Sequence, residues 1–147
     1  MNLEIIAEVA NSHQGKIELV NRIIKEFYHQ GARSIKFQIY FAEDFLTEDH
    51  ERFLHFKKQS FSQKQWIKII NLARKVGYKN IYADVLGQKA FMVAKKIKVD
   101  GYKVHSTDLT NDLLLRKLSK EKKNFFYQLV VQKLQKFIML QNFLKIK

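Results

Sequence analysis

Short apolar runs alternate with longer amphipathic segments along this chain of 147 residues. The short runs are rich in β-branched and aromatic residues, as buried strands are, and they cover 3–10, 33–41, 78–87 and 100–106. In the longer segments apolar residues recur every three or four positions, which is the spacing of one helix face. These helical segments cover 16–32, 61–77, 88–99 and 107–121. A polar, partly helical stretch covers 42–60, an apolar stretch covers 124–131, and a helix-like end covers 132–147.

Residues at the ends of these segments support the predicted helices. Ser62 stands where its hydroxyl can cap the first turn of the helix over 61–77. Gly31 and Gly77 stand where two helices should end, and glycine readily adopts the left-handed conformation that commonly closes a helix.

The alternation of strand and helix, repeated about four and a half times, predicts βα units and a parallel sheet. Two arrangements remain open at this point, a doubly wound sheet and part of a (βα)8 barrel. A complete barrel usually needs roughly 250 residues. A barrel-like chain of this length would form a partial (βα)8 TIM barrel of about four to five units, in a single domain over 1–147.

Composition favours a folded protein of the cytoplasm. Hydrophobic residues make up 46% of the chain, enough for a core, and the absence of cysteine excludes disulfides and thiolate sites. No apolar run approaches the ~20 residues of a membrane span, and the N-terminus has no basic segment before its apolar run, unlike a signal peptide.

The formal net charge of +13 favours anionic partners such as phosphorylated metabolites or nucleic acid. The lysines are scattered along the predicted helices, which is more typical of solvated helix faces. A basic anion- or nucleic-acid-binding module is therefore a less favoured alternative, and we expect neither a nucleic acid nor a membrane as partner.

Polar side chains gather where the predicted strands end, and in parallel βα folds this is where chemistry collects. The first strand carries Glu8 and is followed by Asn11 and His13. The second strand carries Lys36 and Gln38, which share a face because strand residues two apart point the same way.

The third strand ends near Asp84, and the fourth carries Lys103 and His105 on one face, followed by Ser106 and Asp108. Lysines facing inward on neighbouring strands would form a cationic floor for a phosphate or carboxylate ligand. Glu8 on the first strand could balance that charge or transfer a proton.

Each of these residues also has a purely structural interpretation. A lysine at a strand end often extends its ammonium into solvent, and an acid such as Glu8 often pairs in a salt bridge. A lone histidine is more often a satisfied polar group than a ligand. The recurrence of polar residues at successive strand ends is what favours a site.

Four segments resemble the N-terminal part of the sialic acid (N-acetylneuraminate) synthase family. They read "AEVANSHQG", "GARSIKFQ", "FSQKQWIKIINLARKVG" and "VDGYKVHSTDLTNDLLLRKL". They occur in the family's order, and the resemblance covers residues 3 to about 125, which makes it specific.

The resemblance implies a TIM barrel that condenses phosphoenolpyruvate with N-acetylmannosamine or a related amino sugar in surface glycan biosynthesis. It implies a divalent metal, Mn or Mg, that polarises the sugar aldehyde. It places Lys36, Lys103 and Ser106 at the phosphate and carboxylate of phosphoenolpyruvate, and Gln38 near the sugar. Glu8 matches an acid that manages protons at the reacting centre.

Further substrate-binding positions implied by the resemblance are Asn11, His13 and Asp108. Many relatives carry a threonine or serine at the position of Asp84, and an acid there would repel a phosphate. An imine-forming aldolase barrel, using Lys36 or Lys103, is an alternative that the opening "NSHQG" disfavours.

The chain departs from the family pattern from about residue 127, and the family's two metal-ligand histidines have no counterpart in it. We therefore expect either a synthase-like protein that is incomplete by itself, or an inactive truncated fragment or half of a split synthase. A homodimer or a missing C-terminal half is the expected protein partner, because half a barrel leaves an open sheet edge and one uncovered face.

Overall fold

A computed structural model describes residues 4–127, except for the side chain of Tyr127. These residues form five strands, β1 (Ile6–Glu8), β2 (Ser34–Ile39), β3 (Asn80–Val85), β4 (Gly101–Val104) and β5 (Asn124–Tyr127). The α-helices are α1 (Ile17–His29), α2 (Phe53–Gln59), α3 (Gln63–Val76), α4 (Gly87–Lys96) and α5 (Asp112–Leu118). Two short 3-10 helices, η1 (Ala42–Asp44) and η2 (Ser106–Asp108), follow β2 and β4.

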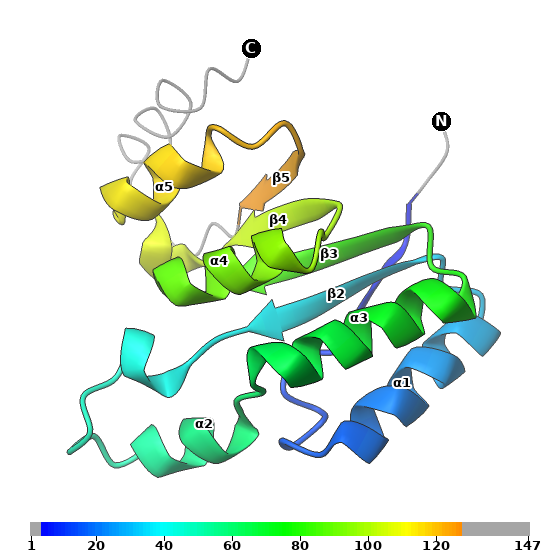
Figure 1. Ribbon diagram of the computed structural model, residues 1–147, viewed down its shortest axis with the longest axis horizontal. Coiled ribbons are helices and arrows are strands. Elements are labelled where there is room, and N and C mark those ends of the chain that lie inside the picture. The colour runs from blue at the N-terminus through cyan, green and yellow to red at the C-terminus, as the bar shows by residue number, and fades with distance from the viewer. Residues whose placement is uncertain (1–3, 128–147) are drawn as a thin grey trace.

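The five strands are all parallel and lie side by side in chain order, from β1 to β5. The helices pack on one face of this sheet, with α1 and α3 against one half and α4 and α5 against the other (Figure 1). A doubly wound sheet reverses its strand order and carries helices on both faces. The described residues show neither feature, so the doubly wound alternative is wrong for this part of the chain.

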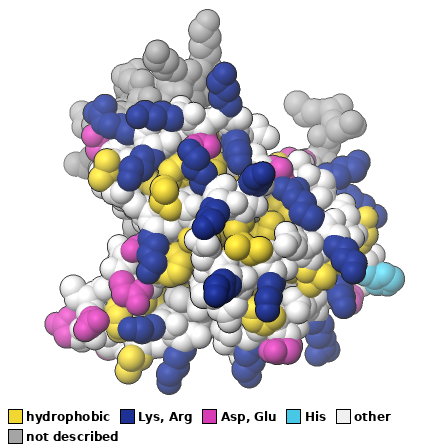
Figure 2. All heavy atoms as spheres, viewed as in Figure 1, with side chains coloured by type: hydrophobic (Ala, Val, Ile, Leu, Met, Phe, Trp, Pro, Cys, Tyr) yellow, Lys and Arg dark blue, Asp and Glu magenta, His cyan; other side chains and the backbone are white. Residues whose placement is uncertain are grey.

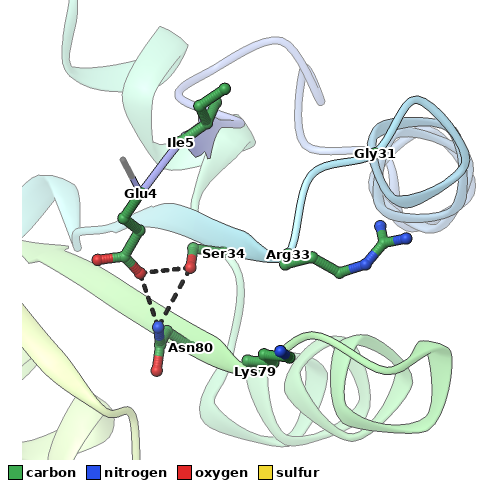
Figure 3. A pocket seen from close by; sticks show the side chains of 7 residues that line it. All are labelled: Glu4, Ile5, Gly31, Arg33, Ser34, Lys79 and Asn80. Carbon is green, nitrogen blue, oxygen red and sulfur yellow. Dashed lines mark hydrogen bonds between the residues drawn. The ribbon is translucent and has the colours of Figure 1, made fainter. Parts of the chain in front are cut away.

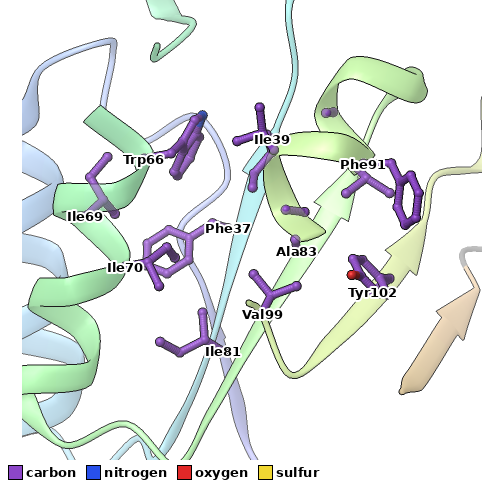
Figure 4. Packing of buried hydrophobic residues seen from close by; sticks show 14 of the residues in the cluster. Phe37, Ile39, Trp66, Ile69, Ile70, Ile81, Ala83, Phe91, Val99 and Tyr102 are labelled. Carbon is purple, nitrogen blue, oxygen red and sulfur yellow. The ribbon is translucent and has the colours of Figure 1, made fainter. Parts of the chain in front are cut away.

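The core lies between the sheet and its helices. From α3, Trp66, Ile69 and Ile70 pack toward Phe37 of β2, while Phe91 of α4 lies near Tyr102 of β4 (Figure 4). Side chains of a strand alternate between faces, so these apolar residues leave the intervening polar residues on the opposite face. We call that helix-free face the bare face.

Local sequence explains the best-predicted helix. Ser62 and Gln65 form a capping box at the start of α3, in which the Ser62 hydroxyl accepts the Gln65 amide and the Gln65 side chain accepts the Ser62 amide. Gly77 closes the helix in the left-handed conformation at φ +115°. Both predicted caps of this helix are confirmed.

Most predicted elements are shorter in the structure, and two of them much shorter. The strand over 3–10 is only Ile6–Glu8 in β1, because residues 9–15 form a tight turn that uses the chain's own carbonyls. The helix over 107–121 is divided into η2 and α5, because the Asn111 side chain caps a new helix start at the amide of Leu114. The predicted segment 132–147 lies outside the described residues.

No helix within residues 4–127 is both long and apolar enough to cross a membrane. Lysine and arginine side chains are spread over the visible helical face between apolar and acidic ones, and they do not form a single stripe (Figure 2). This distribution agrees with the interpretation of the lysines as solvated residues.

Candidate functional site

The carboxyl half of the bare face carries a row of three polar side chains. Strand register places Gln38, Asp84 and Lys103 side by side on β2, β3 and β4. Residues in register on parallel strands point to the same face. Of the predicted strand-end cluster, the fold therefore brings these three residues together, with Asp84 in the middle of the row.

Glu8 and Lys36 form a second pair on the same face. They are register partners on β1 and β2, and the Lys36 Nζ atom lies 3.0 Å from Glu8 Oε1. The Lys36 side chain is 14% exposed, whereas that of Glu8 is 49% exposed. Glu8 thus reaches from the strand to solvent, and its carboxylate is neither deeply buried nor unpaired.

Asp84 is the more deeply buried acid. Its side chain is 1% exposed, and its Oδ2 atom accepts a hydrogen bond from Nζ of Lys103, itself only 12% exposed. Burial raises the pKa of Asp84, and the nearby charges of Lys103, His105 and Lys36 act against that rise. The Asp84 Oδ1 atom has no hydrogen-bond partner among the described residues.

These two pairs correct the prediction of a cationic floor. Both lysines face the site as expected, but each already has a carboxylate at its ammonium group, so the four side chains nearly cancel in charge. The sequence showed Asp84 as a group that would repel a phosphate. Its pairing with Lys103 was missed, although an acid and a lysine near the ends of adjacent predicted strands were the available signal.

Asn11 and His13 lie in the turn after β1. The His13 ring is 2% exposed, packs against the Phe61 ring at a tilt with 4.7 Å between centroids, and accepts the Gly15 amide at Nδ1. Burial lowers the His13 pKa, which favours the neutral ring. Within residues 4–127, His13 Nε2 and Asn11 Oδ1 are buried without a hydrogen-bond partner. His13 is therefore packed into the interior here, and its role in substrate binding stays a prediction.

Asp108 connects two loops at the same end of the sheet. Its Oδ2 atom accepts the amide of Gly87, the first residue of α4, at 3.2 Å, and its Oδ1 atom accepts the Asn111 side-chain amide at 2.9 Å. Ser106, in the same turn, is half-buried. Both oxygens of Asp108 are thus occupied by the protein, and its substrate contact stays a prediction.

Asp44 was not predicted from the sequence as a site residue. It lies in η1 and accepts hydrogen bonds from the backbone amides of Lys89 and Ala90 in the first turn of α4, while burial raises its pKa. Gly87 has a φ of +83°, and a Cβ atom there would meet the Asp44 side chain at 3.0 Å. Two carboxylates from two different loops therefore cap the same helix.

A separate cavity of about 420 Å³ opens at the amino end of the sheet (Figure 3). Glu4 lines it, and the Glu4 Oε1 atom accepts hydrogen bonds from Ser34 and Asn80, which lower the Glu4 pKa. Arg33 and Lys79 stand at its rim. In parallel βα folds the chemistry lies at the other end of the strands, so this cavity is distinct from the candidate site.

The part of the chain that the structure describes offers no set of ligands for the divalent metal that the resemblance implies. Within residues 4–127, His, Asp and Glu side chains do not gather in groups of three or more that could hold an ion. The described residues therefore do not fit a divalent metal ion, and no step of the reaction proposed below uses one.

Comparison with known proteins shows which family this chain belongs to. The NeuB family model matches residues 23–135. The chain belongs to the NeuB family. Among curated proteins, the uncharacterized protein MJ1065 of Methanocaldococcus jannaschii is 34% identical over 116 residues, which are 79% of this chain and 34% of that protein.

Solved structures show the same fold. The sialic acid synthetase of Leptospira borgpetersenii, solved in complex with citrate, superposes with a TM-score of 0.91 at 23% identity, covering 99% of this chain and 50% of that one. The spore coat polysaccharide biosynthesis protein spsE of Bacillus subtilis gives 0.79 at 16% identity, covering 97% and 40%. The α/β fold, as part of a TIM barrel, is confirmed. This NeuB family chain spans about half or less of the length of these relatives.

Proposed function

We propose that this chain forms the phosphoenolpyruvate-binding part of a synthase that condenses phosphoenolpyruvate with N-acetylmannosamine or a related amino sugar. Membership of the NeuB family and the likeness to a sialic acid synthetase support a synthase-type enzyme. The observation that carries the proposal is the pair of lysines on the bare face, Lys36 in the middle of β2 and Lys103 near the carboxyl end of β4. We place the reaction in the cytoplasm.

The proposed reaction joins the methylene carbon of phosphoenolpyruvate to the aldehyde carbon of the open-chain sugar. Water adds to the former enol carbon, and phosphate leaves from it. The ammonium groups of Lys36 and Lys103 hold the phosphate and carboxylate, with Ser106 as a further donor. The half-exposed Glu8 carries a proton at the reacting centre.

The sugar lies, in this proposal, between Gln38 and the turn after β1. The Gln38 amide stands next to Asp84 in the polar row and can bond a hydroxyl group. The Asn11 Oδ1 atom, unpaired among the described residues, can accept a hydroxyl or an amide N–H. His13 and Asp108 support this turn and the loop after β4 through the hydrogen bonds that the structure shows.

Titration with phosphoenolpyruvate tests the proposal. We expect saturable binding by calorimetry, weakened at least about tenfold by Lys36→Gln and by Lys103→Gln, because each change removes a charge-assisted contact. The matched control is Lys68→Gln on the exposed side of α3, which changes the net charge equally. Absence of binding, or an equal loss in the control, would contradict the proposal.

We also propose that β1 and β5 pair with further strands, from a second copy or from another polypeptide. They are the two edges of the described sheet, and their outer backbone groups form an open ladder there. Light scattering of the purified chain should then show self-association. A dispersed monomer at high concentration would contradict pairing with a second copy.

A further inference from the structure

Asp84 holds an unusual position for a group in an anion-binding site. It is 1% exposed, its Oδ2 atom takes the ammonium of Lys103, and its Oδ1 atom has no partner among the described residues. A buried carboxylate is stable only when it is paired. Lys103 therefore supplies most of what keeps Asp84 in place.

The charges around Asp84 come from the strands on each side. Lys36 on β2, Lys103 on β4 and His105 directly after β4 lie close enough to favour its ionised form. Glu8 on β1 takes part of the Lys36 charge through their ion pair. An anion arriving at Lys103 would meet Asp84 at the same ammonium group, and two anions cannot share it without strong repulsion.

We propose that Asp84 is an internal counter-anion, which occupies Lys103 until an anionic substrate displaces it. This inference rests on the proposed function, and it adds a specificity requirement. The displaced carboxylate stays buried and needs hydrogen-bond donors. The substrates at this site must therefore bring both an anionic group for Lys103 and a hydroxyl or amide N–H for Asp84. Phosphoenolpyruvate supplies the first, and the hydroxyls of an amino sugar supply the second.

Acylation of Lys103, followed by peptide mass spectrometry, tests the pairing without any substrate. In Asp84→Asn, Lys103 should react several-fold faster with acetic anhydride, because its amine is no longer held by a carboxylate. The matched control is Asp49→Asn, which changes the net charge equally at an exposed loop position. Equal rates in the original chain and Asp84→Asn would overturn the proposal.

Sulfate binding tests the competition, because sulfate keeps its charge over the working pH range. Removing the charge of Asp84 should tighten sulfate binding about tenfold by calorimetry, as expected for the loss of a nearby like charge. Unchanged affinity in Asp84→Asn, or equal tightening in Asp49→Asn, would overturn the proposal. Asp84→Ser serves as a smaller second variant, and circular dichroism checks that each variant folds.

If neither variant folds, the resonance of the Asp84 carboxyl carbon in the unaltered chain still tests the proposal. The Asp84 carboxyl carbon resonance should shift when sulfate saturates the site, and a resonance that stays in place while sulfate binds overturns the proposal.

The two proposals fail separately. Faster acylation and tighter sulfate binding without any phosphoenolpyruvate binding would support the counter-anion and reject the synthase. Phosphoenolpyruvate binding that is lost in Lys103→Gln but unchanged in Asp84→Asn would support the synthase and reject the counter-anion.

Discussion

Glu8 and Lys36 are partners twice, once in the backbone register of β1 and β2 and once through an ammonium and a carboxylate 3.0 Å apart. The neighbouring strands repeat the arrangement with Asp84 and Lys103. The two pairs differ in burial, because Glu8 reaches solvent and Asp84 does not. Similar contacts should therefore contribute very differently to stability.

Glu8→Gln should lower the free energy of unfolding by less than about 1 kcal/mol, because a half-exposed ion pair is screened by water. Urea denaturation measures the loss, with Glu51→Gln on an exposed loop as the matched control. A loss of several kcal/mol would mean that the pair is effectively buried.

Lys103→Met should lower the free energy of unfolding by about 3 kcal/mol, because it leaves Asp84 buried without its partner. Adding Asp84→Asn to that variant should recover more than half of the loss. A double-mutant cycle in urea measures the coupling between the two residues. Losses that simply add would contradict a direct ion pair.

His13 should make stability depend on pH near neutrality. Burial lowers its pKa in the folded chain below the ordinary value of 6.5, so the unfolded chain takes up the proton first as pH falls. The contribution of the neutral ring is fully present above pH 6.5. It should be lost below that at up to about 1.4 kcal/mol per pH unit, until the folded pKa is reached.

Denaturation curves between pH 5 and pH 8 measure this dependence on His13. His13→Gln should flatten it, whereas His29→Gln, at an exposed position in the last turn of α1, should leave it unchanged. A steep pH dependence that survives in His13→Gln would assign it to other groups.

Gly77→Ala should destabilise the fold more than Gly31→Ala. Both glycines have a left-handed φ, at +115° and +97°, and alanine costs about 1 kcal/mol there. Only at Gly77 would the added Cβ meet another group, the Tyr28 hydroxyl at 2.7 Å. Thermal denaturation should therefore give the larger drop in melting temperature for Gly77→Ala, and equal drops would show that Tyr28 moves aside freely.

Periodicity and caps were enough to predict strands β2 to β4 and helix α3, because each depends on residues close in sequence. Ser62 and Gly77 show this directly, since each acts on a backbone group within a few residues. The pairing of Asp84 with Lys103 was not predictable in this way. It depends on how β3 and β4 align, and a shift of one residue would turn the two side chains to opposite faces.

The burial of the His13 ring was not predictable for a related reason. The family resemblance places His13 in substrate binding, and in the structure its ring packs against Phe61, just before α3. Packing between segments about 50 residues apart leaves no pattern in a local window. The polar residues of the bare face could be identified from the sequence, but the pairing of each lysine with a carboxylate could not.

The shared cap of α4 links loops that are distant in sequence. Asp44 follows β2, Asp108 follows β4, and both hold amides at the helix that follows β3. Three consecutive loops at the rim of the sheet should therefore open together or not at all. Slow hydrogen exchange at the Gly87 and Ala90 amides would report that shared opening, and a ligand reaching any one loop would stiffen all three.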